Sequence, residues 1–118
     1  MIIREWRARA HLSRAQAYPQ HFESRVRPEL ARIPGFLGAS LRERRVGELV
    51  EFLVLTRWAS LEAIRAFAGA DIERAVVDPA AQAALASFDT HVHHYEVLPN
   101  SGAAQIESGA GPRERTGE

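Results

Sequence analysis

Three of the five histidines fall close together near the C-terminus, at positions 91, 93 and 94. Alternate side chains of a strand point to opposite faces, so His91 and His93 share one face and His94 lies on the other. Two histidines at this spacing can chelate a metal ion, but a metal site needs three or four ligands. No Asp or Cys falls beside them, so we expect exposed or core-edge histidines and no metal.

His94 is the candidate for proton-transfer chemistry. On its face it is flanked by Val92 and Leu98, with Glu96 next along. Histidine is the side chain whose ordinary pKa lies nearest neutral pH, so in an apolar cavity His94 would serve as a general base. The alternative is a structural histidine that is hydrogen-bonded inside the core.

Four aromatic side chains are candidates for a flat hydrophobic pocket that suits an aromatic ligand, namely Trp6, Phe52, Trp58 and Phe67. The alternative is that Trp58 and Phe67 belong to the core beneath a helix. Arg4 neighbours Trp6 along the same strand, and a Trp beside an Arg in a cavity would suit an acidic aromatic compound.

Composition excludes several kinds of chemistry. The 118 residues include no cysteine, and all basic residues are arginine, so thiolate nucleophiles, Cys-ligated metals and lysine Schiff bases are excluded. Residues 1–45 carry a net charge of +6 and residues 46–118 a net charge of −6. The arginines are scattered and no nucleic-acid motif accompanies them, so the opposed halves fit pairing within or between subunits better. No nucleophile elbow, phosphate-binding glycine loop or dinucleotide motif is present.

No stretch approaches the roughly 18 apolar residues needed to cross a bilayer. The N-terminus also lacks the basic-then-apolar pattern of a secretory signal. We therefore expect a cytoplasmic protein that binds neither membrane nor nucleic acid.

Apolar periodicity predicts the order of elements. Period-two alternation marks strands, and apolar residues three or four apart mark helices. The predicted strands are 2–10, 36–44, 48–58 and 90–98, and the predicted helices are 15–33, 60–69, 71–77 and 79–87. Pro28 should kink or break the first helix unless a local irregularity absorbs it.

The order β-α-β-β-α-β predicts a ferredoxin-like α+β fold. The right-handed crossover rule gives an antiparallel four-stranded sheet of order 4-1-3-2 with the helices on one face. The uncovered face would carry apolar residues, so we expect a homodimer in which two sheets pack face to face. The domain should span residues 1–98, with residues 99–118 forming a disordered tail.

Four segments resemble the antibiotic biosynthesis monooxygenase family of small dimeric α+β barrel proteins. They are IIREWRARA, EFLVLTRWASLEAIRAFAG, DIERAVVDP and HVHHYEVL, in the right order and spacing from Met1 to Leu98. The resemblance implies a homodimer with a cavity in each subunit. In characterised members the cavity admits a polyphenol or quinol, which is oxygenated without metal, flavin or haem.

The leading interpretation is therefore a cofactor-independent monooxygenase-like protein that acts on a small aromatic substrate. His94 would be the base, and the candidate substrate-binding residues are Trp6, Phe52, Arg57, Trp58, Phe67 and Tyr95, with Arg57 as an anion anchor. The alternative is a non-catalytic ligand-binding or stress-response protein on the same scaffold. Haem binding comes third, because the places of the haem-degrading branch's Asn, Trp and His here hold Trp6 or Arg7, Phe67 and Val76.

Overall fold

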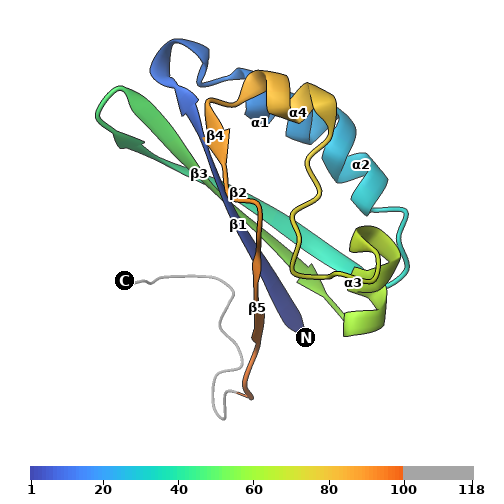
Figure 1. Ribbon diagram of the computed structural model, residues 1–118. Coiled ribbons are helices and arrows are strands. Elements are labelled where there is room, and N and C mark those ends of the chain that lie inside the picture. The colour runs from blue at the N-terminus through green and yellow to red at the C-terminus, as the bar shows by residue number, and fades with distance from the viewer. Residues whose placement is uncertain (100–118) are drawn as a thin grey trace.

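The sheet is organised around its first strand. The computed structural model describes residues 1–99, in which β1 (Ile2–His11) pairs with β3 (Leu49–Trp58) along its whole length. The other edge of β1 pairs with β4 (Ser87–Phe88) and β5 (His93–Glu96), and β2 (Phe36–Val46) lies outside β3. All pairs are antiparallel and the order is β2-β3-β1-β4, with β5 also on β1 (Figure 1). The ferredoxin-like α+β prediction is confirmed.

All the helices cover one face of this sheet (Figure 1). The first crossover is a continuous helical segment made of a 3-10 turn at Leu12–Arg14, α1 (Ala17–His21), a π-helical turn at Phe22–Val26 and α2 (Arg27–Leu30). The second crossover contains α3 (Leu61–Ala68) and α4 (Pro79–Ala84). None of these helices is long and apolar enough to cross a bilayer.

Pro28 does not break the first helix, because a π-helical turn comes just before it. Proline lacks the N–H that an α-helix would use at that position. In the π-helical turn, the N–H of Arg27 instead donates to the carbonyl of Phe22, five residues earlier. The expected irregularity is therefore present, and the helical path continues through Pro28 to Leu30.

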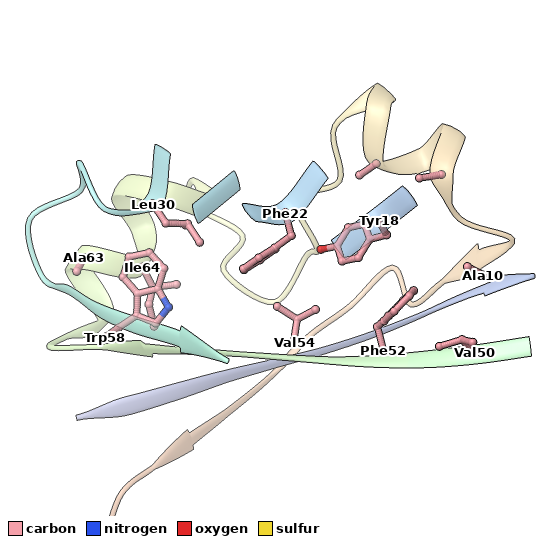
Figure 2. Close-up of a cluster of buried hydrophobic side chains, with 12 residues drawn as sticks. Ala10, Tyr18, Phe22, Leu30, Val50, Phe52, Val54, Trp58, Ala63 and Ile64 are labelled. Carbon is pink, nitrogen blue, oxygen red and sulfur yellow. The ribbon is translucent and has the colours of Figure 1, made fainter. Parts of the chain in front are cut away.

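The core lies between the helices and the inner face of the sheet. Along β3 every second residue is buried, from Val50 to Trp58, as period-two alternation requires. Figure 2 shows Tyr18 and Phe22 reaching from the helical segment towards Phe52 and Val54 on β3. Trp58 is fully buried between Phe36 and Phe67, with ring centroids 5.3 and 5.7 Å away.

The prediction of a helix over 71–77 is wrong. This segment pairs with the stretch between β4 and β5 instead: the Ala75 N–H donates to Thr90 O and the Val92 N–H donates to Glu73 O, each at 2.8 Å. Arg74 and His91 form an antiparallel bridge. A seven-residue helix is marginal in water, and an extended partner satisfies the same backbone groups.

The predicted last helix and last strand are also corrected. Helix α4 ends at Ala84, and Ser87–Phe88 forms the short strand β4 on β1. The expected continuous strand over 90–98 is reduced to β5, because the chain between β4 and β5 leaves β1 to pair with 71–77. The domain boundary at 98 stays a prediction, and the predicted tail lies outside the described residues apart from Pro99.

Gly35 sets how closely α3 approaches the turn before β2. A Cβ at Gly35 would lie 2.6 Å from the Cβ of Ala63, whereas a Cβ at Gly47 would meet nothing within 4 Å. Both glycines have positive φ, at 94° and 61°, so alanine is strained at either position by about 1–2 kcal/mol.

We expect Gly35→Ala to lower the free energy of unfolding by about 1–3 kcal/mol more than Gly47→Ala, because only the first also overpacks the contact with α3. Urea unfolding of both variants measures the difference. Equal losses would contradict this account of the contact.

Candidate functional site

A cavity of about 270 Å³ lies between the inner face of the sheet and the helices. Its floor comes from β1 and β3, with Arg4 and Trp6 on one strand and Val54 and Thr56 on the other. The volume falls just below the range of roughly 300–1,000 Å³ typical of pockets for drug-sized ligands. The cavity therefore suits a small compound of a few rings.

The roof of the cavity comes from the first helical segment. Tyr18, Phe22, Val26 and Leu30 line it at four-residue intervals, and each is buried or half-buried. The mouth lies where the lining residues are exposed, at Glu29, Ala66, Val76 and Asp78. The walls are thus mostly apolar, and the carboxylates lie at the rim.

Two aromatic walls are held by fixed contacts. The Trp6 indole N–H donates to the Asp89 carbonyl at 2.7 Å, and its ring meets Tyr18 edge-on at 6.0 Å. Phe67, from α3, stacks on Trp58 at 5.7 Å. Because backbone and core hold both rings, they form preformed apolar surfaces for a flat ligand.

Arg4 is a buried cation in the cavity floor. It is 5% exposed, and it donates from Nη1 to the Ile72 carbonyl and from Nη2 to the Arg74 carbonyl at 2.9 Å. Its guanidinium lies 5.6 Å from the centroid of the Phe67 ring. Burial lowers the pKa of Arg4 to about 10, so it stays protonated at neutral pH.

His94 is a neighbour of Arg4 and does not line the cavity. Its Nε2 lies 3.0 Å from Arg4 Nη1. A guanidinium only donates, so Nε2 accepts this hydrogen bond and its lone pair is occupied. Burial and then the charge of Arg4 lower the pKa of His94, with Glu73 acting in the opposite direction. This placement argues against direct proton abstraction by His94 from a ligand in the cavity.

Asp78 and Tyr18 bring further polar groups to the cavity. Asp78 accepts from the Ala81 N–H at 2.8 Å, and its other oxygen lies 3.0 Å from His21 Nε2. Burial opposes ionisation of Asp78, but these hydrogen bonds outweigh it and hold its pKa below the usual value. Burial, with a contribution from the charge of Asp78, raises the pKa of Tyr18, so its hydroxyl stays protonated.

The structure brings only Trp6 and Phe67 of the sequence-predicted site residues to the cavity wall. Phe52 and Trp58 are fully buried in the core. Arg57 and Tyr95 lie on the opposite face of the sheet, where Arg57 covers Gly38 and Tyr95 is 53% exposed. An anion anchor at Arg57 would therefore not reach this cavity, because adjacent strand residues point to opposite faces.

Sequence reasoning missed Tyr18, Glu29, Thr56 and Asp78, and it took Arg4 only as a neighbour of Trp6. Thr56 did carry a signal, since it is the one polar residue on the buried face of β3. The Asp78-Pro79 pair also signals a helix start, which α4 confirms. The position of Asp78 at the cavity mouth depends on the fold and has no local signal.

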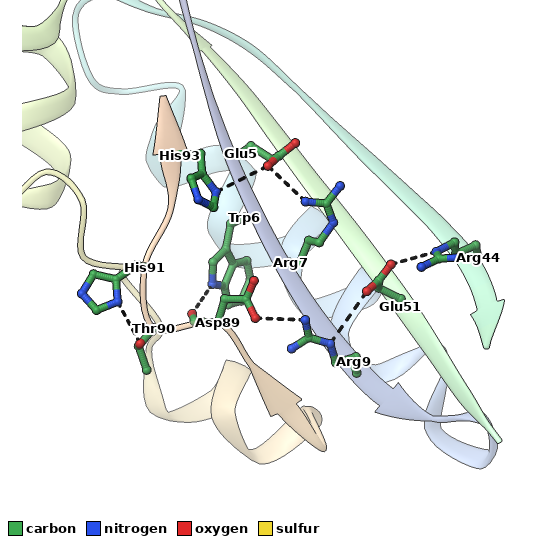
Figure 3. A network of polar contacts seen from close by, with 10 residues as sticks. All are labelled: Glu5, Trp6, Arg7, Arg9, Arg44, Glu51, Asp89, Thr90, His91 and His93. Atoms are coloured by element: carbon green, nitrogen blue, oxygen red, sulfur yellow. Dashed lines mark hydrogen bonds and ion pairs between the residues drawn. The ribbon is translucent and has the colours of Figure 1, made fainter. Parts of the chain in front are cut away.

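The outer face of the sheet carries a network of ion pairs (Figure 3). Glu5 contacts Arg7 at 3.1 Å, and Arg9 contacts Asp89 at 2.9 Å and Glu51 at 3.8 Å. The three C-terminal histidines do not converge: His93 lies near Glu5, His91 near Thr90 and His94 near Arg4. Within residues 1–99, no three His, Asp or Glu side chains are grouped to hold a metal ion.

Comparison with solved structures gives the same fold at low sequence identity. A candidate antibiotic biosynthesis monooxygenase from Bacillus cereus matches with a TM-score of 0.60 at 19% identity, over 89% of this chain and 98% of that chain. The haem-degrader MhuD from Mycobacterium tuberculosis matches with a TM-score of 0.57 at 22% identity, over 86% and 100%. SnoaB, a cofactor-independent oxygenase from Streptomyces nogalater, matches with a TM-score of 0.54 at 15% identity, over 86% and 96%. These likenesses establish the fold alone.

Comparison by sequence gives the family. No curated protein matches the chain significantly. The profile of the family described as antibiotic biosynthesis monooxygenase (ABM) matches residues 1–94, which is most of the chain and includes every strand apart from the last two residues of β5. The chain belongs to the antibiotic biosynthesis monooxygenase family.

Proposed function

We propose that the protein is a cofactor-independent, monooxygenase-like enzyme that acts on a small phenol- or quinol-type compound. The observation that carries this proposal is the preformed cavity walled by Trp6 and Phe67 in a chain of the ABM family. Its volume suits a ligand of a few rings, and its apolar walls would exclude water from a reactive intermediate.

In this reaction the substrate itself supplies the electrons. A phenol loses its hydroxyl proton, and the electron-rich phenolate reduces molecular oxygen. One oxygen atom forms the second carbonyl of a quinone and the other leaves as water, so one phenol and one O₂ give one quinone and one water. The protein must accept a proton, hold the ring and keep bulk water out.

We assign the proton acceptor to Glu29 rather than to His94. The lone pair of His94 at Nε2 is occupied by Arg4, and the side chain lies off the cavity wall. Of the two carboxylates at the mouth, Asp78 already accepts two hydrogen bonds and its pKa is held low, which makes it a weak base. The Glu29 side chain makes no hydrogen bond or ion pair to another described residue, and it also lines the cavity.

A non-catalytic ligand-binding protein is the second candidate, favoured by one observation: the expected base His94 supports Arg4 instead of facing the cavity. Haem binding has less support. No His, Cys or Met is among the described residues that line the cavity, and burial raises the pKa of Tyr18, which disfavours an iron-bound tyrosinate.

Dimerisation through the outer face of the sheet is part of the proposal. Leu53 and Leu55 on β3 are half-buried there in a single chain, and Leu37 on β2 is 51% exposed. A second sheet would cover these side chains. The cytoplasmic localisation stays a prediction.

Oxygen uptake with a panel of hydroquinones and naphthols tests the enzyme proposal. We expect uptake by the unsubstituted protein and a fall of about 10²-fold or more in kcat/KM for Glu29→Gln, as for loss of a general base. Glu62→Gln, an exposed acid on α3 away from the cavity, should leave the rate unchanged. Absence of oxygen uptake across the panel would refute the monooxygenase proposal. Binding of a panel compound without oxygen uptake would favour a non-catalytic ligand-binding protein.

Light scattering tests the dimer. We expect a mass of twice the 13.1 kDa of one chain. Leu55→Arg should yield monomers, because it places a cation in the centre of the packed sheets. Leu61→Arg, on the helical side, should stay dimeric. A single-chain mass for the unsubstituted protein would refute the proposed dimer.

The lowered pKa of His94 predicts a stability change with pH. The unfolded histidine titrates near 6.5 and binds its proton more tightly than the folded one. The stabilisation is therefore present above about pH 6.5 and is lost as the pH falls through the folded pKa. His94→Gln, which keeps an acceptor for Arg4, should reduce the fall in unfolding free energy on acidification. His11→Gln, an exposed control, should leave that fall unchanged. Identical profiles of unfolding free energy against pH for the unsubstituted protein and both variants would contradict the role given to His94.

A further inference from the structure

We propose that the cavity binds an aromatic carboxylate, with Arg4 as the residue that binds the carboxylate group. This proposal deepens the proposed function and rests on it for the aromatic nature of the ligand. It adds that the compound is an acid and that it enters with its charged group towards the floor of the cavity.

Arg4 carries a buried charge that no described residue compensates. Arg4 is 5% exposed and lines the cavity, yet no carboxylate lies within ion-pair distance of it among the described residues. Its polar contacts are two carbonyls and one imidazole, none of them an anion. Buried charges in proteins are normally paired, because removing an ion from water is costly. A bound anion would supply the missing partner.

The Arg4 guanidinium also keeps hydrogen-bond donors that no described residue uses. A guanidinium has five N–H groups in a planar fork. Nη1 uses two, towards the Ile72 carbonyl and His94, and Nη2 uses one, towards the Arg74 carbonyl. The Nε–H and the second Nη2–H have no partner among the described residues. Free guanidinium N–H groups of this kind bind a carboxylate, in a bidentate pair where two of them point the same way.

The surroundings of Arg4 complete the site. Thr56 is its cross-strand partner on the same face and also lines the cavity, where its hydroxyl accepts from the Trp58 indole N–H at 2.8 Å. The apolar walls of Phe67, Trp6 and Val54 lie next to these groups and would hold a ring. The carboxylates of Glu29 and Asp78 at the mouth repel an acid group there, which favours the orientation with the carboxylate inward.

A structural role for Arg4 is the competing explanation. Its bonds to the carbonyls of Ile72 and Arg74 tie the segment before α4 to the sheet. In that case, loss of Arg4 would disturb the cavity for every ligand equally. A pair of probes of the same shape that differ only in charge separates the two explanations.

The test is calorimetric titration at neutral pH with 2-naphthoate and its uncharged analogue 2-naphthamide. We expect the unsubstituted protein to bind 2-naphthoate about tenfold or more tightly than 2-naphthamide, as for a charge-assisted bidentate pair. Arg4→Met should abolish this preference, because it should weaken 2-naphthoate binding far more than 2-naphthamide binding. Arg7→Met removes an arginine on the opposite face of the same strand and should keep the preference.

The proposal is overturned if the unsubstituted protein binds the two probes equally, prefers 2-naphthamide or binds neither. It is also overturned if Arg4→Met weakens both probes by the same factor. The comparison in the unsubstituted protein needs no variant, so it decides the matter even if Arg4→Met does not fold. A preference for 2-naphthoate without oxygen uptake with any phenol would refute the proposed function alone. Oxygen uptake without the preference for 2-naphthoate would refute the carboxylate-binding role of Arg4 alone.

Discussion

Strand β1 is hydrogen-bonded along both edges, and the rest of the structure depends on that position. Its whole length pairs with β3, while its other edge is shared between β4 and β5. The inward residues of β1 therefore lie at the centre of the covered face. Two of them, Arg4 and Trp6, form the floor of the cavity, whereas Ala8 and Ala10 are small and fully buried. The cavity therefore lies over the half of β1 that carries Arg4 and Trp6, whose N–H groups need hydrogen-bond acceptors.

The fold could be predicted because its signals are local. Period-two alternation in 2–10 and 48–58 and the Pro-Gly turn at 34–35 are properties of short segments. The prediction of a helix over 71–77 is wrong because the backbone partners of this segment, Thr90 and Val92, lie outside any local window of sequence. No window of neighbouring residues contains that information.

The site was predictable only in part, because some of its contacts also join residues that are distant in the sequence. Alternation alone separates Arg57 from Trp58, so the sequence already argued against placing both in one pocket. That the buried cation is Arg4, and that His94 supports it, depends on the register between β1 and β5. Which face the helices cover decides which arginine is inside, and that is a property of the whole sheet.

The π-helical turn before Pro28 also sets the direction in which the helical residues that line the cavity point. A straight α-helix rotates about 100° per residue, so a side chain twelve positions on would lie about 120° away around the axis. Tyr18 and Leu30 are twelve positions apart, yet both line the cavity. The π-helical turn takes up one extra residue and so returns the helix nearly to its starting phase. The four-residue repeat of Tyr18, Phe22, Val26 and Leu30 thus records, in the sequence itself, a helix that is locally underwound.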